Sequence, residues 1–185
     1  GYCLTKDPLL ADWSNRKIFH SSKCLNMSLD AVDVNDKMPL YSFNLLKKHM
    51  KKIKGKQLLI MGVSYRKDVA DTRSSPSAIF YRNCLKHGAQ ISLYDPLVDY
   101  WHEFGLPVSN SLNKPVKDKV DALILTVDHD QYLKMGIKKF TELLKPNGLI
   151  LDCSNVINDV KAKKLYRKGF KLIGVGKGHW NKYEA

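Results

Sequence analysis

From residue 55 onward, short apolar runs alternate with longer stretches in which apolar residues recur at helical spacing. The apolar runs predict buried strands at residues 57–62, 90–94, 121–127, 148–153 and 171–175. Ser75-Pro76 begins an intervening helix that ends at Gly88, and further helices are predicted at 132–144 and 158–168. This alternation predicts an α/β fold with a Rossmann-like, doubly wound parallel sheet of about five strands.

Ligands of such sheets bind beyond the carboxyl ends of the strands. The loops after Gly62, Tyr94, Val127 and Cys153 are therefore the first places in which to expect functional side chains.

A long helix is predicted before residue 55. Its apolar stripe runs from Ala31 through Val34, Met38 and Tyr41 to Leu45, with Asn26 or Ser28 as a possible cap and Pro39 as a kink or break. Leu46, Met50 and Ile53 continue the stripe. Little chain precedes this helix to cover the stripe, so we expect a second subunit or another domain to pack on it.

The change of pattern divides the chain into a helical segment, residues 1–54, and an α/β domain, residues 55–185. The chain lacks a starting Met and opens inside a motif. We therefore expect it to be a piece of a longer protein.

Composition narrows the class of protein. The formal net charge of +13 favours an anionic partner, such as phosphorylated small molecules, nucleic acid or a membrane surface. No segment is apolar enough for a membrane span, and the first ten residues lack the basic start and apolar core of a secretory signal. The four cysteines and six histidines show no metal-ligand spacing, so we expect no metal, reduced thiols and a cytoplasmic location.

The loop after the first predicted strand is polar and basic. It has Gly62 alone in place of the GxGxxG fingerprint, which argues against a dinucleotide site of the usual kind on this domain. Arg66, Lys67 and Arg73 precede a helix start and can bind an anion. The alternative, equally weighted, is that Asp68, Asp71 and Arg73 pair with one another and cap the helix.

Cys3, Lys6 and Asp7 form a second candidate group. In a first helical turn Cys3 and Asp7 share a face, an ammonium nearby favours the thiolate, and a carboxylate can act as base for water. Spacing alone nevertheless favours a small apolar cysteine near a frayed terminus. Cys24, Cys84 and Cys153 lie in apolar or strand contexts and are expected to be inert.

Eight segments together resemble the carboxy-terminal part of the UDP-glucose/GDP-mannose dehydrogenase family, in the order and spacing of that family. They are Cys3-Leu-Thr-Lys-Asp-Pro8, Val34-Asn-Asp-Lys-Met-Pro39, Gly55-Lys56, Gly62-Val-Ser-Tyr-Arg-Lys-Asp68, Asp71-Thr-Arg-Ser-Ser-Pro76, Gly88-Ala89, Tyr94-Asp-Pro96 and Asp121 to His129. The resemblance spans nearly the whole chain, and it implies that an amino-terminal NAD-binding domain is absent from it.

The family oxidises the C6 alcohol of a nucleotide sugar, here a UDP-hexose such as UDP-glucose or UDP-N-acetylhexosamine, using NAD as cofactor. The resemblance implies that Cys3 is the nucleophile that forms a thioester and that Asp7 assists its hydrolysis. It also implies that Lys6 contacts NAD, and it identifies the helix before residue 55 as a homodimer interface.

The resemblance further implies that Tyr65 and Arg66 contact the UDP-sugar and that Arg73 reaches NAD. Asn35 lies in a helix motif with a structural or an active-site role. Two departures bear on the substrate: Arg66 stands where lysine is usual, and residues 152–155 lack an arginine found there in many members.

Two other classes of function stay open. One is a non-catalytic nucleotide-sugar-binding and dimerisation module, which would describe this chain alone and would leave it without turnover. The other is a basic nucleic-acid-binding α/β domain, which is disfavoured because the aromatic residues do not cluster with the basic ones. We therefore expect no nucleic-acid and no membrane partner.

Overall fold

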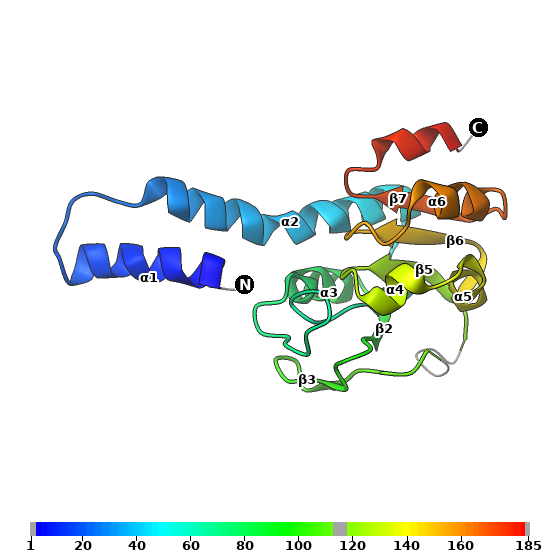
Figure 1. Ribbon diagram of the computed structural model, residues 1–185, viewed down its shortest axis with the longest axis horizontal. Coiled ribbons are helices and arrows are strands. Elements are labelled where there is room, and N and C mark those ends of the chain that lie inside the picture. The colour runs from blue at the N-terminus through cyan, green and yellow to red at the C-terminus, as the bar shows by residue number, and fades with distance from the viewer. Residues whose placement is uncertain (1–2, 113–117, 184–185) are drawn as a thin grey trace.

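The computed structural model describes residues 3–112 and 118–183. Two antiparallel helices, α1 (Cys3–Lys17) and α2 (Asn26–Met50), extend from a layered α/β unit that contains the rest of the chain (Figure 1). The last turns of α2 lie on the α/β unit, and α1 runs back beside α2, so its first residue points toward that unit.

The sheet has five parallel strands in the order β2-β1-β5-β6-β7. The strands are β1 (Gln57–Met61), β2 (Gln90–Tyr94), β5 (Val120–Leu125), β6 (Leu144–Asp152) and β7 (Lys171–Gly174). All five predicted strands are present, and the fold class is confirmed. The pair β3 (Tyr100–Trp101) and β4 (Leu106–Pro107) forms a small antiparallel hairpin that the apolar pattern did not predict.

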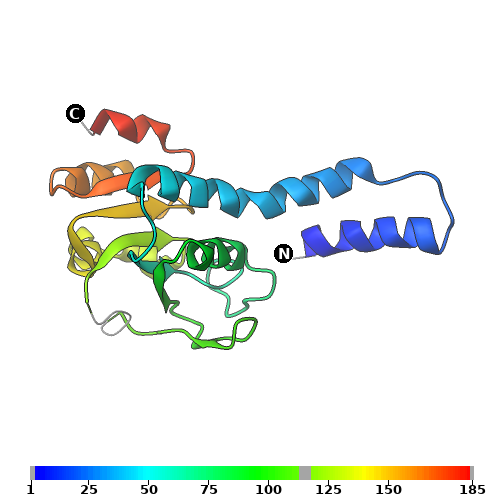
Figure 2. The same ribbon diagram turned by 180° about the vertical axis from the view of Figure 1, so that it is seen from behind.

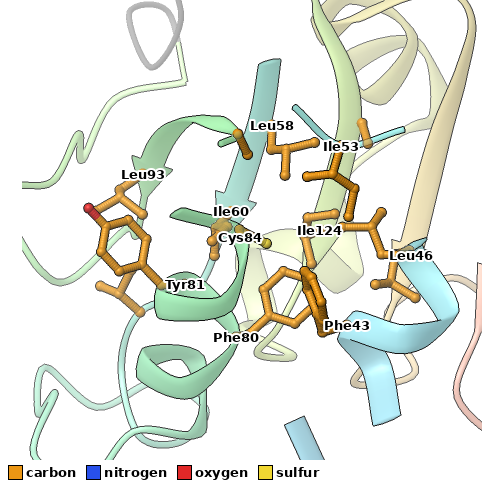
Figure 3. Packing of buried hydrophobic residues seen from close by; sticks show 14 of the residues in the cluster. Phe43, Leu46, Ile53, Leu58, Ile60, Phe80, Tyr81, Cys84, Leu93 and Ile124 are labelled. Carbon is orange, nitrogen blue, oxygen red and sulfur yellow. The ribbon is translucent and has the colours of Figure 1, made fainter. Parts of the chain in front are cut away.

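Helices cover both faces of the sheet, as a doubly wound fold requires (Figure 2). Side chains alternate along β1, so Leu58 and Ile60 face one layer while Leu59 and Met61 face the other. On the first face Phe43 of α2 packs edge-on against Phe80 of α3, in the same cluster as Leu58 and Ile60 (Figure 3).

The helices of the α/β unit are α3 (Pro76–Lys86), α4 (Asp130–Lys134), α5 (Ile137–Leu143) and α6 (Asp159–Tyr166), followed by the 3₁₀ helix η1 (Gly178–Tyr183). The start of α3 is as predicted, because the Ser75 hydroxyl accepts a hydrogen bond from the Ser77 N–H and Pro76 follows at once. The single helix predicted at 132–144 is wrong, since Met135 and Gly136 take extended conformations and separate α4 from α5.

The long helix α2 differs from its prediction at two points. Neither Asn26 nor Ser28 caps it, because the cap position is Leu25 and no side chain bonds there. Pro39 does not break it, and the helix continues to Met50.

The predicted stripe on α2 divides into two parts. Val34, Met38 and Tyr41 are more than half exposed, at 61%, 51% and 54%, whereas Leu46 and Ile53 are buried against the sheet. The lower part of the stripe therefore anchors α2 to the α/β unit, and the upper part presents apolar surface.

The strand order places a reversal of direction between β1 and β5. The chain passes from β1 outward to β2 and then returns to the other side of β1 to form β5. Loops leaving two such strands diverge, and the space between them is where doubly wound sheets bind ligands.

Candidate functional site

A cavity of about 300 Å³ lies at this reversal point, between α2 and the carboxyl ends of the strands. Its lining consists of Asn35, Met38, Pro39, Ser42, Tyr65, Pro76, Ser77, Phe80, Thr126, Cys153, Ser154 and Val175. These lining residues are neutral, and six of them carry an amide, hydroxyl or phenol group: Asn35, Ser42, Tyr65, Ser77, Thr126 and Ser154. Such a lining suits the hydroxyl groups of a sugar or nucleoside better than a phosphate.

Hydroxyl groups fix the floor of the cavity around Gly62. The Ser77 hydroxyl donates to the Gly62 carbonyl at 3.0 Å, and the Thr126 hydroxyl donates to the same oxygen at 2.5 Å. Ser154 donates to the Thr126 carbonyl at 2.7 Å. The loops after β1, β5 and β6 are therefore joined to one another and to the start of α3.

Two buried aspartates hold the loop backbones in place. Asp95, directly after β2, accepts hydrogen bonds from the N–H groups of Val63, Ser64 and Leu97. Asp152, the last residue of β6, accepts from three N–H groups in residues 154–157. Burial opposes the ionised form of Asp95, but the hydrogen bonds outweigh it and lower the pKa of this carboxyl.

The two carboxyls differ in which effect prevails. At Asp152 burial outweighs the hydrogen bonds and raises the pKa of the carboxyl above its usual range.

His129 is fully buried and contacts the segment after β1. Its Nε2 lies 3.1 Å from the Ser64 hydroxyl and 3.3 Å from Asp95 Oδ2, and its Nδ1 accepts from the Asp68 N–H at 3.0 Å. Burial disfavours a second proton on the ring, yet the Asp95 and Asp68 carboxylates outweigh burial and raise the pKa of His129.

The structure places Tyr65 in the wall of the cavity, and Arg66 follows it on an exposed part of the loop. Across residues 3–112 and 118–183, the Arg66 guanidinium has no hydrogen-bond or ion-pair partner, so it is available to an anion beside the cavity. Its neighbour Lys67 pairs with Asp130 at 2.5 Å.

Arg73 makes two parallel hydrogen bonds to Asp71, at 3.0 and 2.8 Å, and this bonding lowers the pKa of Asp71 to about 2. The alternative interpretation of this loop is thus correct for Arg73 and Asp71. The same interpretation is wrong for Asp68, whose N–H donates to His129 and whose carboxylate accepts from the Asp130 N–H. It is also wrong for the helix cap, because the residue that caps α3 is Ser75. The Arg73 side chain remains 69% exposed, so its outer edge faces solvent.

Cys3, Lys6 and Asp7 lie on the first turns of α1, and all three are exposed. Lys6 and Asp7 form an ion pair at 3.3 Å. The structure therefore brings these three residues together on one helix end, and α1 packs along α2 rather than on the sheet.

The remaining cysteines fall into two environments. Burial raises the pKa of the Cys84 and Cys153 thiols to about 12, in keeping with their predicted inertness. The context predicted for Cys24 is wrong, because it is exposed in the loop between α1 and α2.

Two general features of the described residues bear on the class of protein. No group of three or more His, Cys, Asp or Glu side chains among them is placed to hold a metal ion. Among the helices described, none combines the length and apolar content that crossing a membrane requires.

Sequence reasoning located the site but missed several of its residues. It identified the loops at the carboxyl ends of the strands, and Tyr65 and Asn35 within the motifs. It assigned no role to His129, Asp95, Thr126 or Ser77. The sequence did contain one indication of the role of Asp95, which is its place directly after a buried strand. The first N–H groups of neighbouring loops point at that position and need an acceptor there.

Comparison with known proteins decides the family. Residues 59–159 match the UDP binding domain of the UDP-glucose/GDP-mannose dehydrogenase family. The chain is 34% identical over 182 residues to the UDP-N-acetyl-D-mannosamine dehydrogenase of Methanocaldococcus jannaschii, which covers 96% of this chain and 38% of that protein. The chain belongs to the UDP-glucose/GDP-mannose dehydrogenase family.

Structural comparison agrees with this membership. The crystal structure of NDP-N-acetyl-D-galactosaminuronic acid dehydrogenase from Methanosarcina mazei Go1 superimposes with a TM-score of 0.83 and 28% identity, over 95% of this chain and 38% of that one. A UDP-N-acetyl-D-glucosamine 6-dehydrogenase from Pseudomonas aeruginosa is 24% identical over 88% of this chain. The chain spans about 38% of the length of the first two relatives. The predicted family is therefore confirmed, and the part matched is the UDP-binding domain with the helices before it.

Proposed function

We propose that this chain is the nucleotide-sugar-binding part of an NAD-dependent dehydrogenase that oxidises the C6 alcohol of a UDP-hexose, such as UDP-glucose or a UDP-N-acetylhexosamine, to the uronic acid. The observation that carries the proposal is the neutral cavity at the β1–β5 reversal point, where the lining residue Tyr65 is followed in the chain by the exposed Arg66. The names of the relatives, which are UDP-sugar dehydrogenases, support the same substrate class.

The substrate is divided between two kinds of group in this proposal. The hydroxyl, amide and phenol side chains of the cavity, Tyr65 among them, bind the uncharged part of the nucleotide sugar. Arg66 binds the diphosphate, because a guanidinium offers paired N–H donors to phosphate oxygens.

NAD does not fit the loop after β1. This loop has one glycine, Gly62, and Val127 fills the space next to the Gly62 Cα. A Cβ at Gly62 would stand 2.7 Å from the Cβ of Val127. A pyrophosphate needs the close backbone approach that glycines at this turn allow. We therefore propose that another domain holds NAD, with the exposed side chains of Lys6 and Arg73 reaching it from this chain. When bound, NAD accepts the hydrides that leave C6.

The proposed role of Cys3 is covalent. After C6 has lost its first hydride and become an aldehyde, the thiolate adds to it, and loss of the second hydride leaves C6 held as a thioester, which shields the intermediate from early release. Asp7, one helical turn further along α1, takes a proton from the water that cleaves the thioester. The exposure of both side chains supports the proposal, since a substrate can approach them from solvent.

The exposed upper part of the α2 stripe supports a homodimer, with Val34, Met38 and Tyr41 buried between two copies. Within this proposal the helical segment 1–54 has two uses, assembly and presentation of Cys3.

The roles of Cys3 and Asp7 are tested in the full-length parent protein by intact-mass spectrometry after incubation with NAD and UDP-sugar. Cys3→Ser should abolish acid formation, whereas Asp7→Asn should accumulate an acylated protein, because the thioester forms but is hydrolysed slowly. Cys24→Ser is the matched control, since this thiol is also exposed yet has no role. Full turnover by the Cys3→Ser protein would refute the assignment of Cys3, whereas a full-length parent without any turnover would favour the alternative of a binding module without catalysis.

A further inference from the structure

The segment Ser64–Asp68 carries both proposed substrate contacts, Tyr65 and Arg66, yet it belongs to no helix or strand. Its conformation must therefore come from contacts with other parts of the chain. The buried ring of His129, which follows β5, supplies several of them.

The ring contacts both ends of the segment. The Asp68 N–H donates to Nδ1 at 3.0 Å, so in the neutral ring the proton is on Nε2. Nε2 then faces the Ser64 hydroxyl at 3.1 Å and Asp95 Oδ2 at 3.3 Å. Residues 64 and 68 are thus both fixed to a single imidazole.

The Ser64 hydroxyl extends this contact to the middle of the segment. It donates to the Arg66 carbonyl at 3.2 Å while its oxygen is free to accept from Nε2. The backbone of Arg66 is therefore connected to His129 through one hydroxyl group.

The surroundings hold the ring in one orientation. The Tyr132 ring packs perpendicular to it, with centroids 5.1 Å apart and an interplanar angle of 88°. Beside it, Asp68 has a left-handed backbone, with φ of 54°, and its carboxylate accepts from the Asp130 N–H at 3.1 Å. A left-handed aspartate persists only where such contacts over-determine it.

We propose that His129 is a positioning residue, which sets the conformation of Ser64–Asp68 so that Tyr65 reaches the cavity wall and the Arg66 guanidinium stays unpaired for a diphosphate. This inference rests on the proposed binding of a UDP-sugar at the cavity. The sheet itself is held by other contacts, among them the pairing of β1 with β2 and β5. Loss of the imidazole should therefore affect ligand binding more than folding.

The test measures UDP affinity by calorimetry on the 185-residue chain, with every variant at the same pH. His129→Leu removes both nitrogen contacts and should weaken UDP binding about tenfold or more. His129→Asn keeps an acceptor near the Nδ1 position and should recover part of this loss. Ser64→Ala removes only the hydroxyl link, should weaken binding severalfold, and serves as the second variant if His129→Leu does not fold.

Tyr132→Phe is the control for loss of stability. It removes a buried hydroxyl that lies 3.4 Å from the Tyr94 carbonyl and leaves the segment untouched, so UDP affinity should not change. A fall in UDP affinity with Tyr132→Phe equal to that with His129→Leu would mean that destabilisation alone explains the effect, and would overturn the proposal.

A double-mutant cycle separates positioning from a merely structural role. If His129 acts through Arg66 as well as Tyr65, then His129→Leu should weaken UDP binding by a smaller factor in an Arg66→Ala background than in the parent chain. The proposal would be overturned if the losses of UDP affinity in the two single variants simply multiplied in the double variant. It would also be overturned if a folded His129→Leu chain bound UDP with unchanged affinity.

Failure of the proposed function gives a different pattern. Arg66→Ala would then leave UDP affinity unchanged, and the positioning role would be decided by the backbone amide resonances of residues 64–68. These should move and exchange faster with solvent in His129→Leu but not in Tyr132→Phe. Unchanged amides in a folded His129→Leu chain would overturn the proposal by themselves.

Discussion

Replacement of Asp95 tests how the loops around the cavity are held. Its Oδ2 accepts from the N–H groups of Val63 and Ser64 at 2.9 and 3.1 Å and lies 3.3 Å from His129 Nε2, while Oδ1 accepts from the Leu97 N–H at 3.0 Å. The carboxylate is fully buried. If the carboxylate is removed, these N–H donors lose their acceptor, and water cannot reach the buried site to take its place.

The two substitutions differ in how many of these bonds they spare. Asp95→Asn can keep one oxygen at the Oδ2 position and loses the bond to Leu97, which costs about 1.5–3 kcal/mol for a bond to a charged group. Asp95→Ala strands three backbone donors at about 1–3 kcal/mol each, or roughly 3–9 kcal/mol. Since a domain is stable by only about 5–15 kcal/mol, the alanine variant should lose a large part of the stability of the chain.

Urea unfolding followed by circular dichroism at neutral pH measures both changes. Asp33→Asn is the matched control, because Asp33 is an exposed partner of Lys37 one turn away on α2 and should cost no more than about 0.5 kcal/mol. If Asp95→Ala cost as little as Asp33→Asn, the carboxylate would not be what organises these loops.

The same residue predicts an acid dependence. Since the folded state lowers the pKa of Asp95, its stabilising effect is present above about pH 4 and is lost as the pH falls through the lower folded-state value. The difference in stability between the parent chain and Asp95→Asn should therefore shrink as the solution is acidified.

Two further predictions concern the floor of the cavity and the assembly. Gly62→Ala should lower the free energy of unfolding in urea by about 2–4 kcal/mol, because φ is +105° and the new Cβ would meet Val127. Gly55→Ala is the control, since φ is +77° but the space around it is open, and it should cost about 1–2 kcal/mol. Equal costs would contradict the steric reasoning. Val34→Asp with Tyr41→Asp should convert a dimer to a monomer in light scattering, because charges cannot be buried between two copies of α2, and an unchanged mass would place the interface elsewhere.

The sequence allowed the sheet to be predicted well, because five separate apolar runs each match one buried strand, from Gln57–Met61 to Lys171–Gly174. It failed where tertiary contacts override local pattern. The stretch 132–144 has continuous helical periodicity, but extended backbone at Met135 and Gly136 divides it. Pro39 suggested a break in a helix that in fact continues, and its ring lines the cavity.

The candidate site could be located but not assembled from sequence. Ligand position follows from the strand order, so Tyr65 and Arg66 were found by their place after the first strand. The link between Ser64 and His129 joins residues 65 positions apart, and no local spacing indicates such a contact. The pairing of Arg73 with Asp71 was left open because both interpretations use the same residues.

The central claim is that the cavity between β1 and β5 binds the nucleotide sugar, and titration of the isotope-labelled chain with UDP, followed by NMR, tests it most directly. The amides of Tyr65, Arg66, Thr126 and Ser154 should shift with a single affinity, and Arg66→Ala should weaken that affinity by about 1.5–3 kcal/mol. The amides of Asp121 and Lys145, at the amino ends of the strands, should stay in place. Shifts confined to that opposite edge, or an affinity unaffected by Arg66→Ala, would contradict the account.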